Sequence, residues 1–224
     1  MDKINSFEII MELVKGCHYK DETGEYNCYI KSEYNGRDVS IWNCKYLLNQ
    51  VLRQVSIPDE NKLVSRAARK LWEEIAPEGN KNINDYYYHE KIVATKSGAK
   101  IKIYKGANKN PTEEKILNKG DNFIFKDVFH LEHVVPISTI IDELIRLDEH
   151  NELNYETLND VINKIYVCRM TKEEDRGIKA KYNRGDTLDY KEVIEKYYKS
   201  KDNKLIIEIE STLFNIDNSF LKNA

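Results

Sequence analysis

The sequence lacks any long apolar run. No stretch approaches the length that a bilayer-spanning helix needs, and the first residues, MDKINSFEIIMELVKG, carry acids through their apolar part and have no small-residue cleavage site. We therefore expect neither a membrane span nor a signal peptide, which makes the cytoplasm the expected compartment. Because 41% of the 224 residues are hydrophobic and 33% are charged, the chain is expected to fold into a globular protein with a charged surface.

The sequence also lacks a CxxC pair. Cys17, Cys28, Cys44 and Cys168 are spread along the chain, and a cytosolic chain keeps such thiols reduced. Cys17, His18, Cys28 and Cys44 together offer the donors of a Cys3His zinc site, but their spacings fit no standard zinc pattern. Buried thiols are the preferred interpretation, and a structural Zn²⁺ is not expected.

An excess of positive charge is missing as well. The net charge of -3 argues mildly against a nucleic-acid partner, but the distribution of charge matters more than the total. Residues 91–109 hold six lysines and no acid, and residues 164–184 hold seven Lys or Arg against three acids. Each run is either a surface for nucleic acid or a solvated face.

No repeat, low-complexity tract or Pro/Gly/Ser linker interrupts the chain, which favours a single α+β domain. Within it we assign a possible DNA-recognition role to residues 1–120, a catalytic core to 121–185 and an extension of helix or strand to 186–224. Hydrophobic spacing predicts helices over residues 6–15, 47–55, 59–75, 137–145, 171–181 and 188–200, hairpins over 26–41 and 86–105, and strands over 127–133 and 164–168. Residues 204–215 are open between helix and strand.

The predicted hairpin over residues 86–105 has lysines on both sides of its Ser97-Gly98 turn. A two-stranded ribbon with basic tips can lie in a DNA groove, and we assign this contact to Lys96, Lys100 and Lys102. Lysines at the same positions would also protect an ordinary sheet edge from pairing with another chain.

The stretch FHLEHVVPIS puts His130, Glu132 and His133 at the end of a predicted strand. A second strand, KIYVC, and a helix beginning TKEEDRG follow. Carboxylates are the ligands that a hard cation prefers, and imidazole titrates near neutrality. Glu132 with an acid of the helix can hold a cation, and His133 can act as a general base for phosphodiester hydrolysis. His130 shares a strand face with Glu132, and we expect a supporting role for it.

The segments LEHVVPIS, NKIYVC and TKEEDRGIK resemble the HNH, or ββα-metal, endonuclease family. The resemblance implies that Glu132 is a metal ligand and His133 the base, with Pro136 turning the chain out of the strand. It implies that Asn163, or Asn159 in its place, braces the loop before the second strand. The chain departs from the family pattern on the helix, where no Asn or His occurs. We therefore take Asp175 as the second ligand and Glu174 as the next candidate, although Glu174 also fits a capping box with Thr171.

The connection between Pro136 and Asn163 is longer than in many members of the family and implies an inserted helix. The resemblance covers about fifty residues, 127–179, and implies a DNA endonuclease that uses one Mg²⁺, with Mn²⁺ as a substitute, and no small-molecule cofactor. Arg176, with Arg169 and Lys172, is expected to hold the phosphate.

The expected substrate is double-stranded DNA cut by a homodimeric type II restriction enzyme, because palindromic sites mirror two-fold protein symmetry. Three alternatives remain. One is a DNA-binding module with a degenerate HNH site, another is an anti-phage or toxin effector that needs a partner, and the third is a metal-free structural protein.

Overall fold

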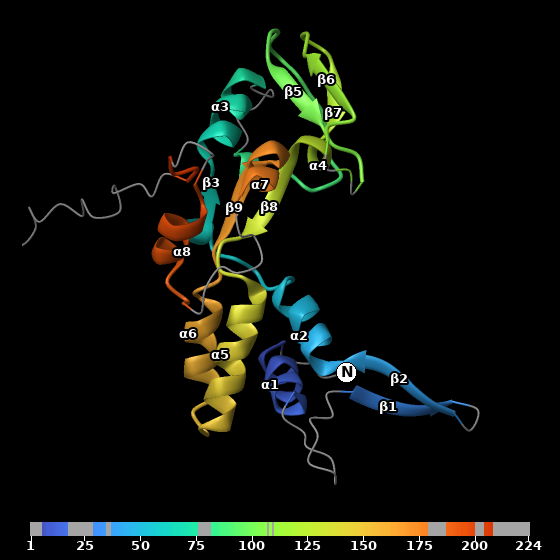
Figure 1. Ribbon diagram of the computed structural model, residues 1–224, viewed down its shortest axis with the longest axis vertical. Coiled ribbons are helices and arrows are strands. Elements are labelled where there is room, and N and C mark those ends of the chain that lie inside the picture. The colour runs from blue at the N-terminus through green and yellow to red at the C-terminus, as the bar shows by residue number, and fades with distance from the viewer. Residues whose placement is uncertain are drawn as a thin grey trace, which may run out of the picture. The chain divides into compact units, whose positions relative to one another are not determined.

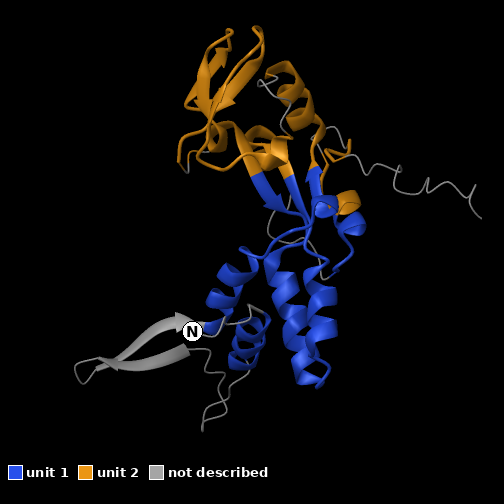
Figure 2. Cartoon of the chain, turned by 180° about the vertical axis from the view of Figure 1, so that it is seen from behind, with its two compact units in different colours: residues 1–63, 131–168, 180–193 blue, residues 64–130, 169–179, 194–224 orange. Residues whose placement is uncertain are grey.

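The computed structural model describes residues 6–17, 29–34, 37–75, 82–106, 108, 110–178, 187–199 and 204–207, and it mixes helices and strands as an α+β protein (Figure 1). The chain divides into two compact units, coloured in Figure 2. Unit 1 comprises residues 1–63, 131–168 and 180–193, and unit 2 comprises 64–130, 169–179 and 194–224. Each unit is assembled from distant segments, whereas we divided the chain by role at residues 120 and 185, and that division stays a prediction.

Unit 1 is mainly helical. Its helices are α1 (Ser6–Gly16), α2 (Cys44–Leu52), α5 (Ile137–Glu149) and α6 (Tyr155–Ile162), and its hairpin pairs β1 (Tyr29–Tyr34) with β2 (Arg37–Asn43). Helix α1 packs against α2 and α5, and α5 packs against α6. Their buried faces hold Ile10, Val14, Leu48, Leu52, Ile140, Ile141, Leu144, Leu158 and Val161. Helices α1, α2 and α5 follow the amphipathic spacing of the sequence, so their prediction is confirmed, whereas α6 was not among the predicted helices.

The close packing of α1 on α2 depends on a glycine. A Cβ at Gly16 would lie 2.8 Å from Sγ of Cys44, so a larger side chain there would push the helices apart. Cys17, Cys44 and Cys168 are reduced and buried, as predicted. His18 and Cys28, the other residues considered for zinc, lie outside the described residues.

Unit 2 holds α3 (Arg66–Ile75), the 3₁₀ turn η2 (Ile83–Asp85), and α4 (Phe125–Val128). Its strands pair as β4 (Lys91–Val93) with β7 (Asn122–Ile124) and β5 (Lys100–Ile103) with β6 (Glu113–Ile116), both antiparallel. Helix α7 (Lys172–Gly177) belongs to the same unit. The core contains Ala68, Ile75, Ile92, Ile101, Leu117, Phe123, Phe125 and Phe129. Trp72 packs on it, with its ring 5.9 Å from that of Phe129.

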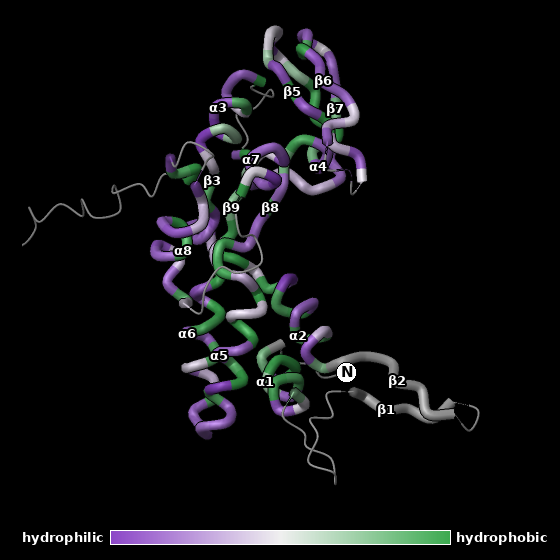
Figure 3. Tube along the Cα trace, in the orientation of Figure 1, coloured by the Kyte–Doolittle hydropathy of each residue, from purple (hydrophilic) through white to green (hydrophobic). Residues whose placement is uncertain are grey.

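A three-stranded sheet carries the segment singled out in the sequence. Its strand order is β3 (Lys62–Val64), β9 (Val167–Thr171) and β8 (Phe129–His133). Where β8 ends, the N–H of Val134 donates to the carbonyl of Tyr166, which precedes β9. Strand β9 is largely hydrophobic and β8 carries hydrophilic residues (Figure 3). The residues between the two strands form α5 and α6, so the predicted insertion is present as two helices.

The predicted helix over residues 59–75 is wrong in its first half. Asp59 does not cap it but begins a 3₁₀ turn, η1 (Asp59–Asn61), and the next residues form β3. Ser65 precedes α3, and its Oγ accepts the N–H of Ala68 at 3.2 Å. A short strand followed by a serine cap gives the same apolar spacing as one longer helix, which explains the error.

The predicted hairpin over residues 86–105 is also wrong. Strand β4 pairs with β7, about thirty residues later in the chain, and β5 pairs with β6 instead of β4. Gly98 is in the left-handed region at φ 103°, so the expected turn is present, but its N–H donates to the carbonyl of Leu117. Strand propensity located the strands, and it could not select their partners.

The remaining boundaries shift by a few residues. Strand β9 starts three residues after the expected one, α7 ends at Gly177, and α8 (Tyr190–Tyr197) lies within the helix expected over 188–200. Of residues 204–215 only 204–207 are described, and Leu205 forms an isolated bridge with Lys199. None of the helices in the described ranges combines the length and the apolar character that crossing a bilayer requires.

The packing of β8 in unit 2 begins at Phe129, which is 0% exposed. We expect Phe129→Ala to lower the free energy of unfolding by about 3–5 kcal/mol, because it removes a ring from a close-packed core and leaves a cavity. Ile116→Ala, at a 56% exposed side chain, should lower it by less than about 1 kcal/mol. Chemical denaturation monitored by circular dichroism gives both values, and equal losses would contradict the assignment of Phe129 to the core.

Candidate metal centre

Strand β8 presents two polar side chains on one face. Phe129 is buried, and the pleat turns alternate residues to opposite sides, so His130 and Glu132 point the same way. His133, the last residue of the strand, falls on the other side with Leu131. The side chains of His130, Glu132 and His133 are all half-buried.

Helix α7 is fixed at its start by a capping box. Thr171 is the N-cap: its Oγ1 accepts the N–H of Glu174, and Oε2 of Glu174 accepts the N–H of Thr171. The same Oε2 accepts the hydroxyl of the buried Ser65, which precedes α3, at 2.5 Å. The predicted capping box is confirmed, and it occupies the carboxylate that we considered as the alternative metal ligand.

Asp175 follows Glu174 on α7 and is buried, with 7% of its surface exposed. Its Oδ1 lies 4.0 Å from Nε2 of His130. Together with Glu132 these residues form a group in which one ligand atom from each lies within 4.8 Å of the others. We call His130, Glu132 and Asp175 the metal triad. The structure therefore brings together Glu132 and Asp175, the two predicted ligands, and adds His130.

The metal triad fits a divalent cation in its donor set and spacing. Carboxylate oxygens suit Mg²⁺ and Mn²⁺, and an imidazole nitrogen suits the first-row transition metals. Two ligands of one such cation, each about 2.1 Å from it, lie at most about 4.2 Å apart. The 4.0 Å between Nε2 of His130 and Oδ1 of Asp175 is within this limit, and all three ligand atoms lie within 4.8 Å of one another. His130, at 27% side-chain exposure, leaves the group open to solvent on one side.

Two basic residues of α7 are engaged close to the metal triad. Nζ of Lys172 donates to the carbonyl of Tyr104 at 3.1 Å, and the guanidinium of Arg176 lies 4.1 Å from the centre of the Tyr104 ring and donates to the carbonyl of Asn108. Burial lowers the pKa of Lys172, and the carboxylate of Asp127 opposes this shift. Both residues hold the chain after β5, so they are less available for phosphate than predicted.

Arg169 is also buried rather than displayed. It is 5% exposed, and its guanidinium lies 4.8 Å from the centre of the Phe125 ring. A guanidinium stacked on an aromatic face inside a core contributes to packing. Burial therefore keeps Arg169 from reaching a DNA backbone in this conformation, which differs from its predicted role.

His133 and Asn163, the other predicted catalytic residues, lie outside the metal triad. Nε2 of His133 is buried. Asn163 is exposed at the end of α6, and its carbonyl accepts Nδ2 of Asn61 at 2.8 Å. Asn61 is 4% exposed and also donates to the carbonyl of Ile165. The side chain that braces the segment before β9 is therefore that of Asn61, a role that the sequence pattern assigned to Asn163.

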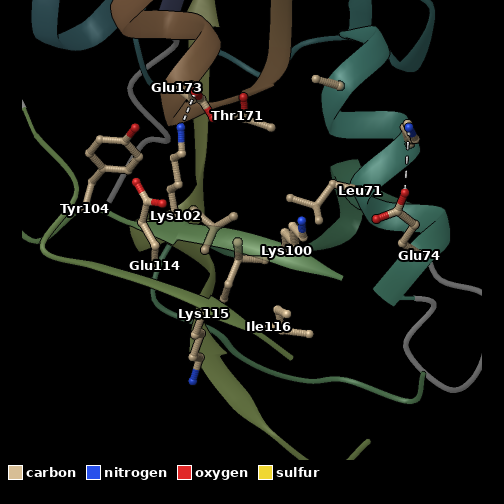
Figure 4. Close-up of a pocket in the computed structure, with 14 residues that line it drawn as sticks. Leu71, Glu74, Lys100, Lys102, Tyr104, Glu114, Lys115, Ile116, Thr171 and Glu173 are labelled. Carbon is tan, nitrogen blue, oxygen red and sulfur yellow. Dashed lines mark hydrogen bonds and ion pairs between the residues drawn. The ribbon is translucent and has the colours of Figure 1, made fainter. Parts of the chain in front are cut away.

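The predicted DNA-binding lysines lie in unit 2. Lys96 donates to the carbonyl of Glu73, and Lys102 forms an ion pair of 2.6 Å with Glu173. Lys100 is exposed. Lys100 and Lys102 line a cavity of about 530 Å³ together with Leu71, Ile101, Ile116 and Tyr104 (Figure 4). Because Glu74, Glu114 and Glu173 also line it, this cavity has mixed charge and is not a simple anion site.

His130 belongs to the metal triad, where we had expected only a supporting role. Strand alternation already placed it beside Glu132, but the family pattern directed attention to the adjacent Glu132-His133 pair. Asn61 carried no sequence signal, because it lies about a hundred residues from the carbonyls that it binds.

Adjacent acids of α7 provide a matched test of the metal triad. Asp175→Asn should weaken Mn²⁺ binding at least about tenfold, because it removes a charged ligand, while Glu174→Gln should leave the affinity nearly unchanged. Isothermal titration calorimetry with Mn²⁺ measures both. Equal affinities for the two variants would exclude Asp175 as a ligand.

For the free energy of unfolding we expect the opposite order, in which a substitution at Glu174 costs more than one at Asp175. Glu174→Ala removes the capping carboxylate and leaves the hydroxyl of Ser65 buried without its acceptor, which should lower the free energy of unfolding by about 1–3 kcal/mol. Asp175→Asn keeps a polar group of the same shape, so urea unfolding should show a smaller decrease in the free energy of unfolding. A larger loss for Asp175→Asn would indicate that the Asp175 carboxylate is a structural ion-pair partner.

Comparison of the chain with protein-family models, with curated proteins and with solved structures gives no match. The likeness to the HNH family is therefore limited to the three segments of the motif. The geometry of the metal triad adds a spatial observation to that likeness, because Glu132 and Asp175 lie in two of the three segments and their ligand atoms are within 4.8 Å of each other.

Proposed function

We propose that this chain is a metal-dependent endonuclease that hydrolyses phosphodiester bonds in DNA and has a ββα-metal (HNH) core. The observation that carries the proposal is the metal triad, whose ligand atoms lie within 4.8 Å of one another. Its residues come from the strand and the helix that the family motif names, with an intervening strand, β9, in the expected order. Chance clusters of exposed acids are common, but this one includes a carboxylate that is 7% exposed.

The metal triad would hold one divalent cation, Mg²⁺ or Mn²⁺, through Glu132, Asp175 and His130. When bound, the cation supplies positive charge against the negative charge that develops on the phosphate and the leaving oxygen. Asp175 is oriented by α7, whose first turn is fixed by the capping box. His130 and Glu132 are oriented by the pleat of β8. The chain thus presents its ligands on regular elements, which hold a site more precisely than loops do.

His133 is the proposed general base and takes a proton from the attacking water. Its neighbour Glu132 belongs to the metal triad, which keeps the base within one residue of a ligand. Nε2 of His133 is buried, so this role requires the end of β8 to open to a water when substrate binds. Because the pleat turns His133 to the opposite side of β8 from Glu132, the role also requires the end of the strand to rearrange in the complex with substrate.

The biological setting follows from analogy alone. A sequence-specific type II restriction enzyme that acts as a homodimer on double-stranded DNA in the cytoplasm is our preferred setting. Residues 1–120 are then the part that reads bases. An anti-phage or toxin effector that needs a partner chain would use the same chemistry on the same metal triad.

A DNA-binding module with a degenerate site is the second candidate. The burial of Nε2 of His133 favours it, and so does the use of Lys172 and Arg176 to hold the segment after β5. In that case the metal triad stabilises the fold around α7 and the chain binds DNA without cutting it. A cation bound in this way would raise the unfolding temperature without supporting cleavage.

Cleavage of plasmid and phage DNA by the purified chain tests the proposal. We expect cleavage in Mg²⁺ or Mn²⁺, none in EDTA, and a rate at least about 100-fold lower for His133→Ala, which is a typical contribution of a general base. His150→Ala, at an exposed histidine after α5, is the matched control and should cleave at the normal rate.

Discrete fragments would support a restriction enzyme, and a smear would support an effector. Normal cleavage by His133→Ala would show that another group is the base. Cleavage that persists in EDTA would overturn the metal-dependent mechanism. Metal-independent DNA binding without any cleavage would favour the degenerate module.

A further inference from the structure

The turn over residues 86–90 of unit 2 displays aromatic side chains to solvent. We call Tyr87, Tyr88 and His89 the aromatic platform. Tyr87 is 82% exposed and Tyr88 is 44% exposed, and His89 is exposed as well. The preceding Tyr86 is 7% exposed and stacks on Phe125 with ring centres 5.9 Å apart. One tyrosine therefore anchors the turn in the core, and its neighbours remain outside.

Backbone hydrogen bonds fix this turn. The N–H of Glu90 donates to the carbonyl of Tyr87, and Oε2 of Glu90 accepts the N–H of Tyr87. The N–H of Lys126 donates to the carbonyl of Tyr88, and that of Phe125 donates to the carbonyl of Glu90. The platform is thus tied to the start of α4, so a ligand that stacks on it would not have to order the backbone first.

Positive charge lies beside the platform. Nζ of Lys126 is 5.9 Å from the centre of the Tyr88 ring, and the rings of Tyr88 and His89 meet edge to face at 5.5 Å. Lys126 is also close enough to Lys172 to lower its pKa, which puts this charge near α7, the helix of Asp175.

A hollow of about 450 Å³ starts at the base of the turn and follows β4. Lys91 and Lys119 line it, together with one acid, Glu90. Oε2 of Glu90 is engaged by the backbone of the turn, so its charge is partly compensated. The hollow therefore offers two ammonium groups, and it is lined by Tyr86 and Glu90, the residues on either side of the platform in the chain.

We propose that the aromatic platform stacks unpaired nucleobases, with the phosphodiester backbone following the hollow along β4. This inference rests on the proposed nuclease function and specifies its substrate as DNA with unpaired nucleotides near the cleaved bond. Exposed aromatic rings flanked by cations are the combination that single-strand-binding proteins use. In a duplex the faces of the bases are covered by their neighbours, so only unpaired or terminal bases can stack on a tyrosine.

A protein partner fits the same surface less well. Such interfaces are depleted in lysine at their centre, whereas Lys126 stands over the Tyr88 ring and Lys91 follows directly in the chain. Tyrosine rings beside lysines match the π-faces and phosphates of a nucleic acid.

The test is binding of a single-stranded oligonucleotide of about 12 nucleotides carrying 2-aminopurine, measured by anisotropy and base fluorescence in EDTA. The double variant Tyr87→Ala/Tyr88→Ala should bind about 5- to 100-fold more weakly and lose the quenching of 2-aminopurine, since stacking on each base is removed. Tyr87→Phe/Tyr88→Phe keeps the rings and should bind nearly as the unsubstituted chain does. Tyr46→Ala, at a 48% exposed tyrosine of α2 in unit 1, is the control and should change nothing.

Binding of the double alanine variant within about twofold of the unsubstituted chain would overturn the proposal. Equal weakening for a blunt duplex would overturn it as well, because it would indicate contacts to the backbone rather than to unpaired bases. Loss of binding in the phenylalanine variant would show that the hydroxyls, not the rings, are required.

The single-strand binding experiment and the DNA cleavage experiment can fail independently of each other. If His133→Ala and Asp175→Asn cleave normally but the platform variants lose single-strand binding, the proposed active site fails and the platform stands. If those two variants abolish cleavage and the platform variants bind normally, the reverse holds.

Discussion

The start of helix α7 is tied to the chain before α3 through one oxygen atom, Oε2 of Glu174. Three donors converge on it: the hydroxyl of Ser65, and the N–H and hydroxyl of Thr171. Ser65 also caps α3, so the starts of two helices share this point. The direction of α7, and therefore the position of Asp175 one residue further on, depends on this contact.

The basic residues near α7 have structural roles that their positions in the sequence do not reveal. Lys172 and Arg176 donate hydrogen bonds to backbone carbonyls after β5. Lys102 forms an ion pair with Glu173, and the guanidinium of Arg169 stacks on the ring of Phe125. Long cationic side chains bury their stems and satisfy carbonyls that no strand partner reaches. A count of positive charge along residues 164–184 cannot distinguish these internal uses from a surface that binds phosphate.

Local signals in the sequence located much of the candidate site, and distant contacts explain what it missed. The capping box of Thr171 and Glu174 spans three residues, and the pairing of Glu132 with Asp175 followed from a motif, so both could be identified. The pairing of β4 with β7 and the bracing of Asn163 by Asn61 join segments far apart in the chain. Periodicity reports which face of an element is apolar and contains no information about its partner. The helix predicted from Asp59 failed for a related reason, because β3 and α3 together imitate one apolar stripe.

The hydrogen bond from the N–H of Val134 to the carbonyl of Tyr166 joins the two ends of the segment that connects β8 to β9. Residues 135–165, which we call the excursion, lie between the two residues that this bond joins. Helix α5 of the excursion is also the element on which α1 and α2 pack. The excursion thus packs with the N-terminal helices, while the ligands of the metal triad lie outside it, on β8 and α7.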